Sequence, residues 1–443
     1  MSPISSKHRL QFLLPIIFFC SAPCFFTGPT NAWAQLEFER PPIDYTDVEV
    51  HDPIAELQQR LDSGEATLAF NEEHGYLDAL LDYFNIDPDS QVLVYSKTSS
   101  QLRRIMPHRP RALYFNENLY LGWCQRGDVL EMIGVDPVSG PIFYSLEQQN
   151  DTPPRFVRDR GQCLTCHASS RTQGIPGPLV RSVFVDLSGQ PLLGSGTFTT
   201  DHRSPFEERW GGWYVTGNHG KMRHMGNEFV PESNGTEQLD RENGANVLNL
   251  ESRLNIRPYI SKGSDIVALM VLEHQSQMQN YITRANFETQ MAEYYDGIMN
   301  KALDRPKGFT SESTERRIAW VGDNLVKSLL FADEFQLKNS IAGSSPYAKN
   351  FQATGHHDSQ GRSLRDFDLQ KRMFRYPCSY MIYSPCFDSL PVSVKTYVTD
   401  RLWAILHGED NDPLFAHLSV LDRAAILEIL NETKPNLFAN KQQ

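Results

Sequence analysis

Residues 112–123 read Ala-Leu-Tyr-Phe-Asn-Glu-Asn-Leu-Tyr-Leu-Gly-Trp, two apolar runs on either side of the polar step 116–118. Alternation with a period of two is typical of a half-buried strand, and a short polar break between two such runs indicates a hairpin. A second pair of strand-like runs, 129–133 and 142–145, flanks the turn sequence Asp-Pro-Val-Ser-Gly at 136–140. These runs predict a small β-sheet in the N-terminal part of the chain.

Helices are expected before and after this sheet. Two short helices, at 52–61 and 73–84, precede a further strand at 91–95. Beyond a polar linker that ends near Asn246, the chain is mainly helical by pattern, beginning with a helix capped by Ser264 and running to about Leu303. The remaining predicted helices are 314–331, 392–406 and 420–430.

The first residues have the features of an export signal. Lys7 and Arg9 precede an apolar stretch at 12–19, and Ala32-Trp33-Ala34 provides a small-x-small cleavage site. The residues before Cys20 and Cys24 do not resemble a lipidation signal. We therefore predict a signal peptide over residues 1–34 and a soluble protein in the periplasm.

Composition excludes several classes of protein. The net charge of −12 argues against nucleic acid or anionic lipid as the main partner, and the 40% hydrophobic content excludes wholesale disorder. After the leader, the longest apolar run is 266–272, which is far too short to span a bilayer. We expect no transmembrane anchor after signal cleavage.

The pentapeptide Cys163-Leu164-Thr165-Cys166-His167 is the most informative motif in the chain. In an exported protein this spacing is typical of covalent haem attachment, because two thiols one helical turn apart can reach the two vinyl groups of one porphyrin. The next residue then places an imidazole under the iron. The motif predicts one haem c, with Cys163 and Cys166 as thioether donors and His167 as axial iron ligand.

Three other interpretations compete for the same residues: a thiol-disulfide site, half of a zinc site and a plain short-loop disulfide. A thioredoxin-like site should follow a buried parallel strand, whereas charged residues precede this motif at Arg155, Arg158, Asp159 and Arg160. A structural zinc site needs further ligands, and the sequence contains no second paired motif. Haem is therefore the favoured interpretation.

The segment 174–179, Gly-Ile-Pro-Gly-Pro-Leu, follows the motif closely and resembles the Gly-Pro-x-Leu loop of class I cytochromes c. The resemblance implies that a proline carbonyl accepts the Nδ1–H of His167, from Pro178 in the best match or from Pro176. Taken by itself, the segment is also compatible with an ordinary surface turn.

Stretches at 98–104, 112–123, 200–227 and 363–384 are similar to a broad family of exported bacterial proteins described only as cytochrome c domain-containing. The likeness covers most of the chain after residue 34, but it implies no activity. Residues 180–193 resemble a β-hairpin instead of the helix found at this point in small cytochromes. The haem segment is therefore expected inside a larger protein.

We predict an α+β fold with a small N-terminal β-sheet and helices, an embedded cytochrome c-like haem segment and a mainly α-helical C-terminal part. The corresponding domain boundaries are 35–150 for the N-terminal α+β domain, 151–230 for the haem-binding segment and 247–443 for the helical domain.

The sixth position of the iron decides between a carrier and a catalyst. The richest source of ligands is the segment 218–227, Asn-His-Gly-Lys-Met-Arg-His-Met-Gly-Asn. Met225 is the first candidate, because its separation from His167 is close to that in small cytochromes. The alternatives in this segment are His224, His219 and Met222, and an open distal site is also compatible with the sequence.

A second set of candidate ligands lies on the predicted helix 264–303. Met270, His274 and Met278 recur every four residues and share one face, although such a stripe is usually core. His202 is a weaker candidate, for which Asp201 or a turn is the expected partner.

Two further features complete the expectations. Cys378 and Cys386 are eight residues apart, so a disulfide between them is predicted for an oxidising compartment, with unpaired thiols as the alternative. Some of the arginines around the haem segment are expected to bind the haem propionates, although a solvated surface is the better expectation for any one of them. These arginines are Arg155, Arg158, Arg160, Arg181, Arg203 and Arg209.

The predicted function is electron transfer by a periplasmic c-type cytochrome, with a protein redox partner. The alternative is a monohaem oxidoreductase with an open distal site and a substrate pocket formed by the C-terminal helical domain. The size of the chain favours the enzyme, since a carrier needs to do little more than cover one haem. The absence of a second haem motif in the sequence favours the carrier.

Overall fold

Six strands form the main sheet, and each pairs antiparallel with the next in sequence order. They are β1 (Val92–Val94), β2 (Arg111–Asn116), β3 (Leu119–Trp123), β4 (Val129–Asp136), β5 (Gly140–Glu147) and β6 (Phe156–Arg158). Both predicted hairpins are present, as β2–β3 and β4–β5. In each one the side chains alternate between the two faces of the sheet.

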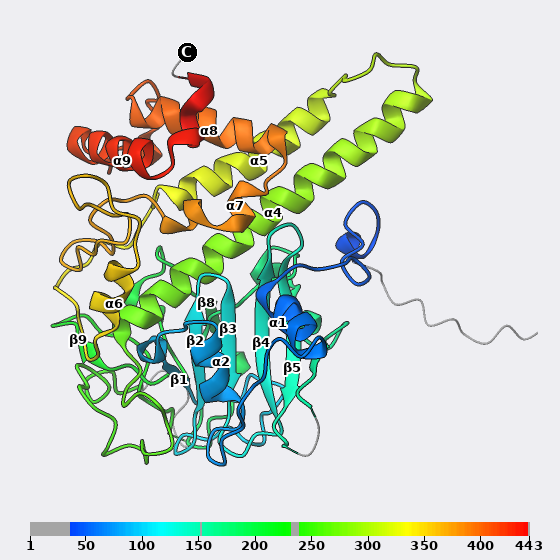
Figure 1. Ribbon diagram of the computed structural model, residues 1–443. Helices are drawn as coiled ribbons and strands as arrows, with labels where there is room; N and C mark the ends of the chain where they lie inside the picture. Colours follow the sequence, from blue (N-terminus) through cyan, green and yellow to red (C-terminus); the bar gives the residue numbers. More distant parts are fainter. Residues whose placement is uncertain (1–35, 151–152, 232–238, 442–443) are drawn as a thin grey trace, which may run out of the picture. The chain divides into compact units, whose positions relative to one another are not determined.

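The computed structural model describes residues 36–150, 153–231 and 239–441 (Figure 1). The α-helices are α1 (Pro53–Asp62), α2 (Leu77–Tyr83), α3 (Leu164–His167), α4 (Ile266–Ala302), α5 (Glu312–Leu329), α6 (Tyr347–Ala353), α7 (Pro385–Asp388), α8 (Val392–Leu406) and α9 (Val420–Thr433). Two minor sheets pair β7 (Arg181–Val183) with β8 (Thr197–Thr199) and β9 (Gly217–Asn218) with β10 (Ala342–Gly343). The fold is α+β as predicted, with a mainly helical C-terminal part.

Short 3-10 helices occur along the whole described chain. They are η1 (Glu37–Glu39), η2 (Pro88–Ser90), η3 (Ser170–Thr172), η4 (Leu193–Ser195), η5 (Phe206–Glu208), η7 (Tyr380–Tyr383), η8 (Pro413–Phe415) and η9 (Pro435–Lys441).

The two faces of the main sheet contribute to different hydrophobic clusters. One face, represented by Tyr114 and Leu121, packs with Leu57 of α1 and Leu77 of α2. The other face carries Phe115, Tyr120 and Val135, which belong to the cluster that contains most of the apolar residues of α4. The sheet therefore lies between the short N-terminal helices and the C-terminal helical part.

Helix α4 is 37 residues long and buries polar as well as apolar side chains, among them Glu273, His274, Gln275 and Asn280. It runs beside α5, which returns along it (Figure 1). The predicted limits of this helix are nearly correct, but its cap is not. Asp265 accepts the N–H of Val267 at 2.8 Å and caps the helix, whereas the hydroxyl of Ser264 accepts a hydrogen bond from the backbone N–H of Leu93 in the sheet.

The predicted hairpin over residues 180–193 is only partly formed. Val185 and Pro191 make an isolated antiparallel bridge around the expected turn. Residues Arg181–Val183 instead pair with Thr197–Thr199, so the main partner strand lies further along the chain than the pattern indicated.

The described residues from Phe38 onward form one compact unit. The domain boundaries proposed from the sequence remain a prediction, and the predicted signal peptide, 1–34, lies outside the described residues. No helix in the described part of the chain is long and apolar enough to cross a membrane.

Candidate functional site

The Cys-x-x-Cys-His motif occupies the single helical turn α3, directly after the last strand of the sheet. Strand β6 ends at Arg158, and the carboxylate of Asp159 accepts the backbone N–H groups of Gly161 at 3.0 Å and Cys163 at 2.9 Å. The carbonyl of Cys163 then accepts the N–H of His167 at 2.9 Å. The sheet and Asp159 together fix where this turn begins.

The two motif cysteines lie on one turn and are not bridged. Cys163 is half-buried and Cys166 is exposed. Burial and the neighbouring carboxylate of Asp159 raise the pKa of the Cys163 thiol to about 12. A catalytic thiol of a disulfide oxidoreductase has a lowered pKa instead, so the surroundings of Cys163 argue against a thiol-disulfide site.

Zinc is also disfavoured. Among the residues that the structure describes, no group of three or more histidine, cysteine, aspartate or glutamate side chains is arranged to hold a metal ion. The motif thus lacks the additional side-chain ligands that a structural zinc site needs.

His167 is held by a reciprocal pair of hydrogen bonds with Gly177. The Gly177 N–H donates to the His167 carbonyl at 2.8 Å, and the His167 Nδ1 lies 2.9 Å from the Gly177 carbonyl oxygen. The prediction that Pro178 or Pro176 supplies this acceptor is therefore wrong by one residue. The Pro178 carbonyl has a different partner, because it accepts the side-chain amide of Asn280 at 3.0 Å.

Helix α4 contacts the loop around Gly177 and Pro178 through the side chain of Asn280. A Cβ atom added at Gly177 would lie only 2.0 Å from the Asn280 Oδ1 atom, so any larger residue at this position would displace the Asn280 side chain. The loop is therefore fixed on one side by the ring of His167 and on the other by a side chain of the long helix.

The free nitrogen of His167 is chemically suited to a metal. With Nδ1–H donating to Gly177, Nε2 carries the lone pair, and no described residue forms a hydrogen bond with it. Burial lowers the pKa of His167, which favours the neutral imidazole that binds iron. The ring of Phe143, on strand β5, lies 5.0 Å away between centroids. These features and the two unbridged thiols fit a covalently attached haem.

The sixth-ligand candidates of the segment 218–227 lie in the protein core. The rings of His219 and His224 are 4.7 Å apart and both contact Phe206. Met222 belongs to the same hydrophobic cluster as Phe206 and Trp210. All four candidates, Met225, His224, His219 and Met222, are buried.

Hydrogen bonds occupy most of the ligand atoms in this segment. The Nδ1 of His219 lies 2.7 Å from the Met222 carbonyl, and its Nε2 accepts the N–H of Asn246 at 3.0 Å. The Nδ1 of His224 accepts the N–H of Gly226 at 3.0 Å, while its buried Nε2 has no partner among the described residues. Only His224 thus keeps a ring nitrogen available.

Met225 packs against strand β7. The Ser182 hydroxyl lies 3.7 Å from the Met225 sulfur, and the Met225 N–H donates to the carbonyl of Arg209. Ser182 and Arg181 are adjacent on the strand and point to opposite faces. Met225 therefore lies on the face of β7 opposite to Arg181.

The second set of ligand candidates comes together with His202. Nδ1 of His274 lies 3.3 Å from Nδ1 of His202, and Nε2 of His274 lies 2.8 Å from the Ser379 hydroxyl. Burial lowers the pKa of His202 to about 4 and that of His274 well below its ordinary value, so both rings are neutral. Met270 and Met278 are also buried, and this face of α4 packs as core.

Of the two expected partners of His202, Asp201 or a turn, the structure shows the turn, and no hydrogen bond joins His202 to the Asp201 carboxylate among the described residues. The carboxylate of Asp201 binds Arg203 at 2.6 Å instead. Other arginines near the motif also have protein partners, including Arg209, which pairs with the buried Glu273 at 3.2 Å. Arg158 donates to the carbonyls of Val48 and Tyr45, and Arg160 lies 3.5 Å from Asp47. For Arg181, which donates to Thr197, the Nε atom is buried without a partner among the described residues.

The predicted disulfide between Cys378 and Cys386 is absent. Both thiols are free and buried, as is that of Cys124. The thiol of Cys386 donates to the Asp136 carbonyl at 3.3 Å and accepts a hydrogen bond from Gln279. Cys386 is thus tied to the sheet and to α4, away from its expected partner.

No protein-family model matches this chain, and the comparisons with curated proteins and with solved structures likewise give no match.

Proposed function

We propose that this chain is an exported c-type cytochrome that carries one covalently attached haem and transfers electrons. The observation that supports the proposal most strongly is the orientation of His167 inside the Cys-x-x-Cys-His motif. The carbonyl of Gly177 engages one ring nitrogen, and the other is left for iron. The resemblance to exported cytochrome c domain-containing proteins supports the same assignment.

The proposed roles follow from the chemistry of the side chains. The thiols of Cys163 and Cys166 would hold the haem through two thioether bonds, each formed by addition of S–H across a vinyl group. The Nε2 atom of His167 would bind the iron, and the carbonyl of Gly177 holds the His167 ring in one tautomer. When bound, such a haem supplies an iron that alternates between the ferric and ferrous states.

The proposal also includes a periplasmic location and a protein redox partner. Both rest on the leader-like sequence over residues 1–34 and on the haem motif. Exposure of Cys166 places one edge of the attachment turn at the surface, where a partner could approach.

A test of haem attachment uses co-expression with a cytochrome c maturation system. The purified protein should keep its colour through acid-acetone extraction, because the thioether bonds survive that treatment. Cys163→Ala and Cys166→Ala should each leave one thioether and shift the pyridine haemochrome band, while Cys124→Ala should leave the band unchanged. Complete loss of haem from the wild-type protein would contradict the proposal.

A second candidate function is a monohaem oxidoreductase with an open distal site. It is favoured by the packing of the ligand candidates, since both nitrogens of His219 are engaged and Met225 packs against Ser182. A cavity of about 610 Å³ also lies beside the motif segment (163–178), between residues 170–173 and helices α4 and α5. It is lined by Arg171, Arg203 and Arg284, among other residues, and could hold an anionic substrate.

Optical spectra of the oxidised and reduced protein, with and without carbon monoxide, distinguish the two candidates. A low-spin protein that does not bind carbon monoxide would support the carrier, with Met225 as the first candidate for the sixth ligand and His224 or His219 as alternatives. A high-spin ferric spectrum and immediate binding of carbon monoxide to the reduced protein would support the open-site enzyme.

A further inference from the structure

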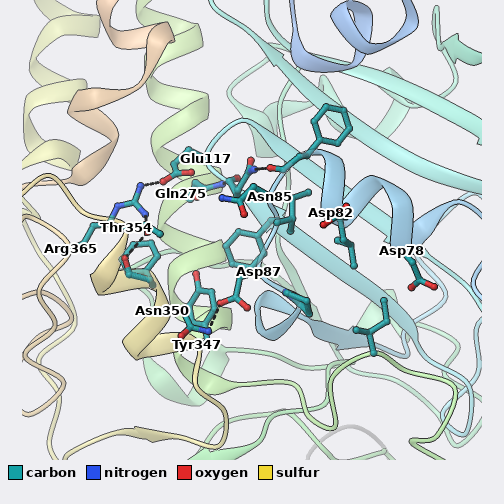
Figure 2. A pocket seen from close by; sticks show the side chains of 18 residues that line it. Asp78, Asp82, Asn85, Asp87, Glu117, Gln275, Tyr347, Asn350, Thr354 and Arg365 are labelled. Atoms are coloured by element: carbon teal, nitrogen blue, oxygen red, sulfur yellow. Dashed lines mark hydrogen bonds and ion pairs between the residues drawn. The ribbon is translucent and has the colours of Figure 1, made fainter. Parts of the chain in front are cut away.

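A cavity of about 700 Å³ lies at the C-terminal end of β2, where Phe115 and Asn116 line it (Figure 2). Its walls come from α2 and the residues after it, from the turn between β2 and β3, from α4 and from α6. The lining residues that matter here are Asp87, Phe115, Glu117, Tyr347, Phe351 and Arg365. None of them belongs to the motif segment, so this cavity is distinct from the proposed haem site.

The charges around the cavity are mostly negative. Glu117 forms an ion pair with Arg365, and the carboxylate of Asp78 pairs with His74 at 2.9 Å. Asp87 has only neutral donors, namely the backbone N–H of Asp89 at 2.9 Å and the amide of Asn350 at 3.1 Å. Among the described residues, the negative charge of Asp87 thus has no cationic partner.

Three aromatic rings line the same cavity as this carboxylate. The centroid of Tyr347 is 6.0 Å from that of Phe115 and 5.8 Å from that of Phe351. The guanidinium of Arg365 lies 4.8 Å from the Phe351 centroid, so one ring of the group already binds a cation. An aromatic wall next to a carboxylate is an arrangement that recognises organic cations.

The hydroxyl of Tyr347 is a polar group of the cavity wall that is available to a ligand. The residue is only 3% exposed, yet its hydroxyl makes no hydrogen bond with any described residue. Figure 2 shows the Tyr347 side chain directed into the space beside Asp87. Burial raises the pKa of Tyr347 well above its ordinary range, so the group remains a neutral phenol that can donate or accept a hydrogen bond.

We propose that this cavity binds a small organic ammonium ion. The cationic group lies against Phe115 and Tyr347 and is neutralised by Asp87, while the Tyr347 hydroxyl bonds a polar substituent of the ligand. The inference goes beyond the proposed electron-transfer function and does not depend on it, because no residue of the haem motif lines the cavity.

Isothermal titration of the full-length holoprotein with choline tests the proposal directly. The matched control ligand is 3,3-dimethylbutan-1-ol, which has the same shape but a carbon atom in place of the charged nitrogen. We expect saturable binding of choline and at least about tenfold weaker binding of the neutral alcohol. The alcohol lacks the positive charge that both the aromatic rings and the Asp87 carboxylate attract. Equal affinities, or no saturable binding of choline, would overturn the proposal.

Two variants locate the binding site. Asp87→Asn removes the charge but keeps an oxygen that can accept the N–H of Asp89, and it should weaken choline binding by about tenfold or more. Tyr347→Phe keeps the ring and should weaken binding about threefold to fivefold through the lost hydrogen bond. The control is Asp89→Asn, because Asp89 lies in the same short helix but binds Ser261 and does not line the cavity.

The variants also keep the proposal falsifiable if one of them fails to fold. Thermal melts identify such a failure before the titrations, and the remaining variant then decides. Wild-type affinity in a folded Asp87→Asn protein, or in a folded Tyr347→Phe protein, would show that choline binds elsewhere and would refute the assignment of this cavity.

Discussion

The motif segment (163–178) and the segment 218–227 both contain histidines at the protein interior, but the chain uses them differently. In the first, the backbone engages Nδ1 of His167 and leaves Nε2 without a protein partner. In the second, backbone groups engage both ring nitrogens of His219, whereas His224 is engaged at Nδ1 alone and keeps a free Nε2, as His167 does. A histidine held through one nitrogen is oriented and still available to a metal, whereas one held through both is a structural residue.

The largest expected contrast comes from replacing each of these two histidines. His167→Ala should change the haem spectrum completely, because it removes the proposed axial ligand. His219→Ala should leave the spectrum as it is and lower the free energy of unfolding by about 1–3 kcal/mol, because the Met222 carbonyl and the Asn246 N–H lose their partner. Spectra and urea unfolding curves measure both effects.

An unchanged spectrum in His167→Ala would show that His167 is not the axial ligand and would contradict the role given to the motif segment. A changed spectrum in His219→Ala would instead show that the segment 218–227 reaches the iron.

The second contrast concerns the ion pair that anchors the segment 218–227 to α4. The carbonyl of Arg209 accepts the N–H of Met225, and its guanidinium pairs with the buried Glu273. Burial raises the pKa of Glu273 to about 7, although Arg209 lowers it. Arg209→Met should therefore reduce the free energy of unfolding by about 3–5 kcal/mol at pH 8, where it leaves a buried charge unpaired.

The sign of the pH dependence follows from proton binding. The folded protein binds a proton at Glu273 up to about pH 7, whereas the unfolded chain releases it near pH 4.5. This carboxyl therefore makes stability fall as the pH rises from about 4.5 to 7. In Arg209→Met the pKa rises further, so the difference from wild type should grow from pH 5 to pH 8 in urea unfolding curves.

A constant difference between Arg209→Met and wild type across this range would contradict the role given to Glu273. The matched control is Arg316→Met, which breaks an exposed pair with Glu312 on α5. Its effect should be small and sensitive to salt.

The third contrast tests Met225 as packing or as a ligand. Met225→Ala should lower the free energy of unfolding by about 2–4 kcal/mol, because the side chain is fully buried against Ser182 and Gly211. If packing is its only role, the spectrum and the binding of carbon monoxide should not change. Loss of a sulfur-to-iron charge-transfer band in the variant would identify Met225 as the sixth ligand.

The smallest expected effect sharpens the description of the motif segment. Asn280→Ala should lower the free energy of unfolding by about 1–3 kcal/mol, because it leaves the Pro178 carbonyl without its donor. It should also shift the reduction potential slightly, since the loop that orients His167 loses its support. Asn286→Ala is the control on the same helix, where the amide bonds the Val138 carbonyl in a different loop.

Equal potentials for Asn280→Ala and wild type would show that Gly177 holds His167 without help from α4. Equal shifts in both asparagine variants would attribute the effect to the helix as a whole.

Local patterns were sufficient to predict most strands and helices. The runs at 112–123 and 129–145 form the predicted hairpins, and 392–406 is the predicted helix with the limits expected. The errors arise where tertiary contacts choose between neighbours of similar chemistry. Ser264 and Asp265 are both good caps, and the choice of Asp265 follows because the Ser264 hydroxyl bonds the sheet.

The candidate site was predictable in its chemistry but not in its geometry. The spacing of Cys163, Cys166 and His167 indicates the ligands, whereas the choice of Gly177 over Pro178 depends on the approach of Asn280 from a helix one hundred residues away in the sequence. The sequence indicates Asp159 only as a charged neighbour of the motif, whereas in the structure its carboxylate accepts the backbone N–H of Cys163. The sequence does not predict the cavity lined by Asp87 and Tyr347, because its walls come from segments that only the folded chain brings together.

Helix α4 makes contact with both proposed sites. Gln275 lines the acidic cavity and Asn280 supports the loop that orients His167, so the two contacts are five residues apart, or about 7.5 Å along one rigid axis. A sliding movement of this helix would displace both contacts by the same amount. Movement of α4 along its axis would therefore shift the cavity wall at Gln275 and the contact of Asn280 with the His167 loop together.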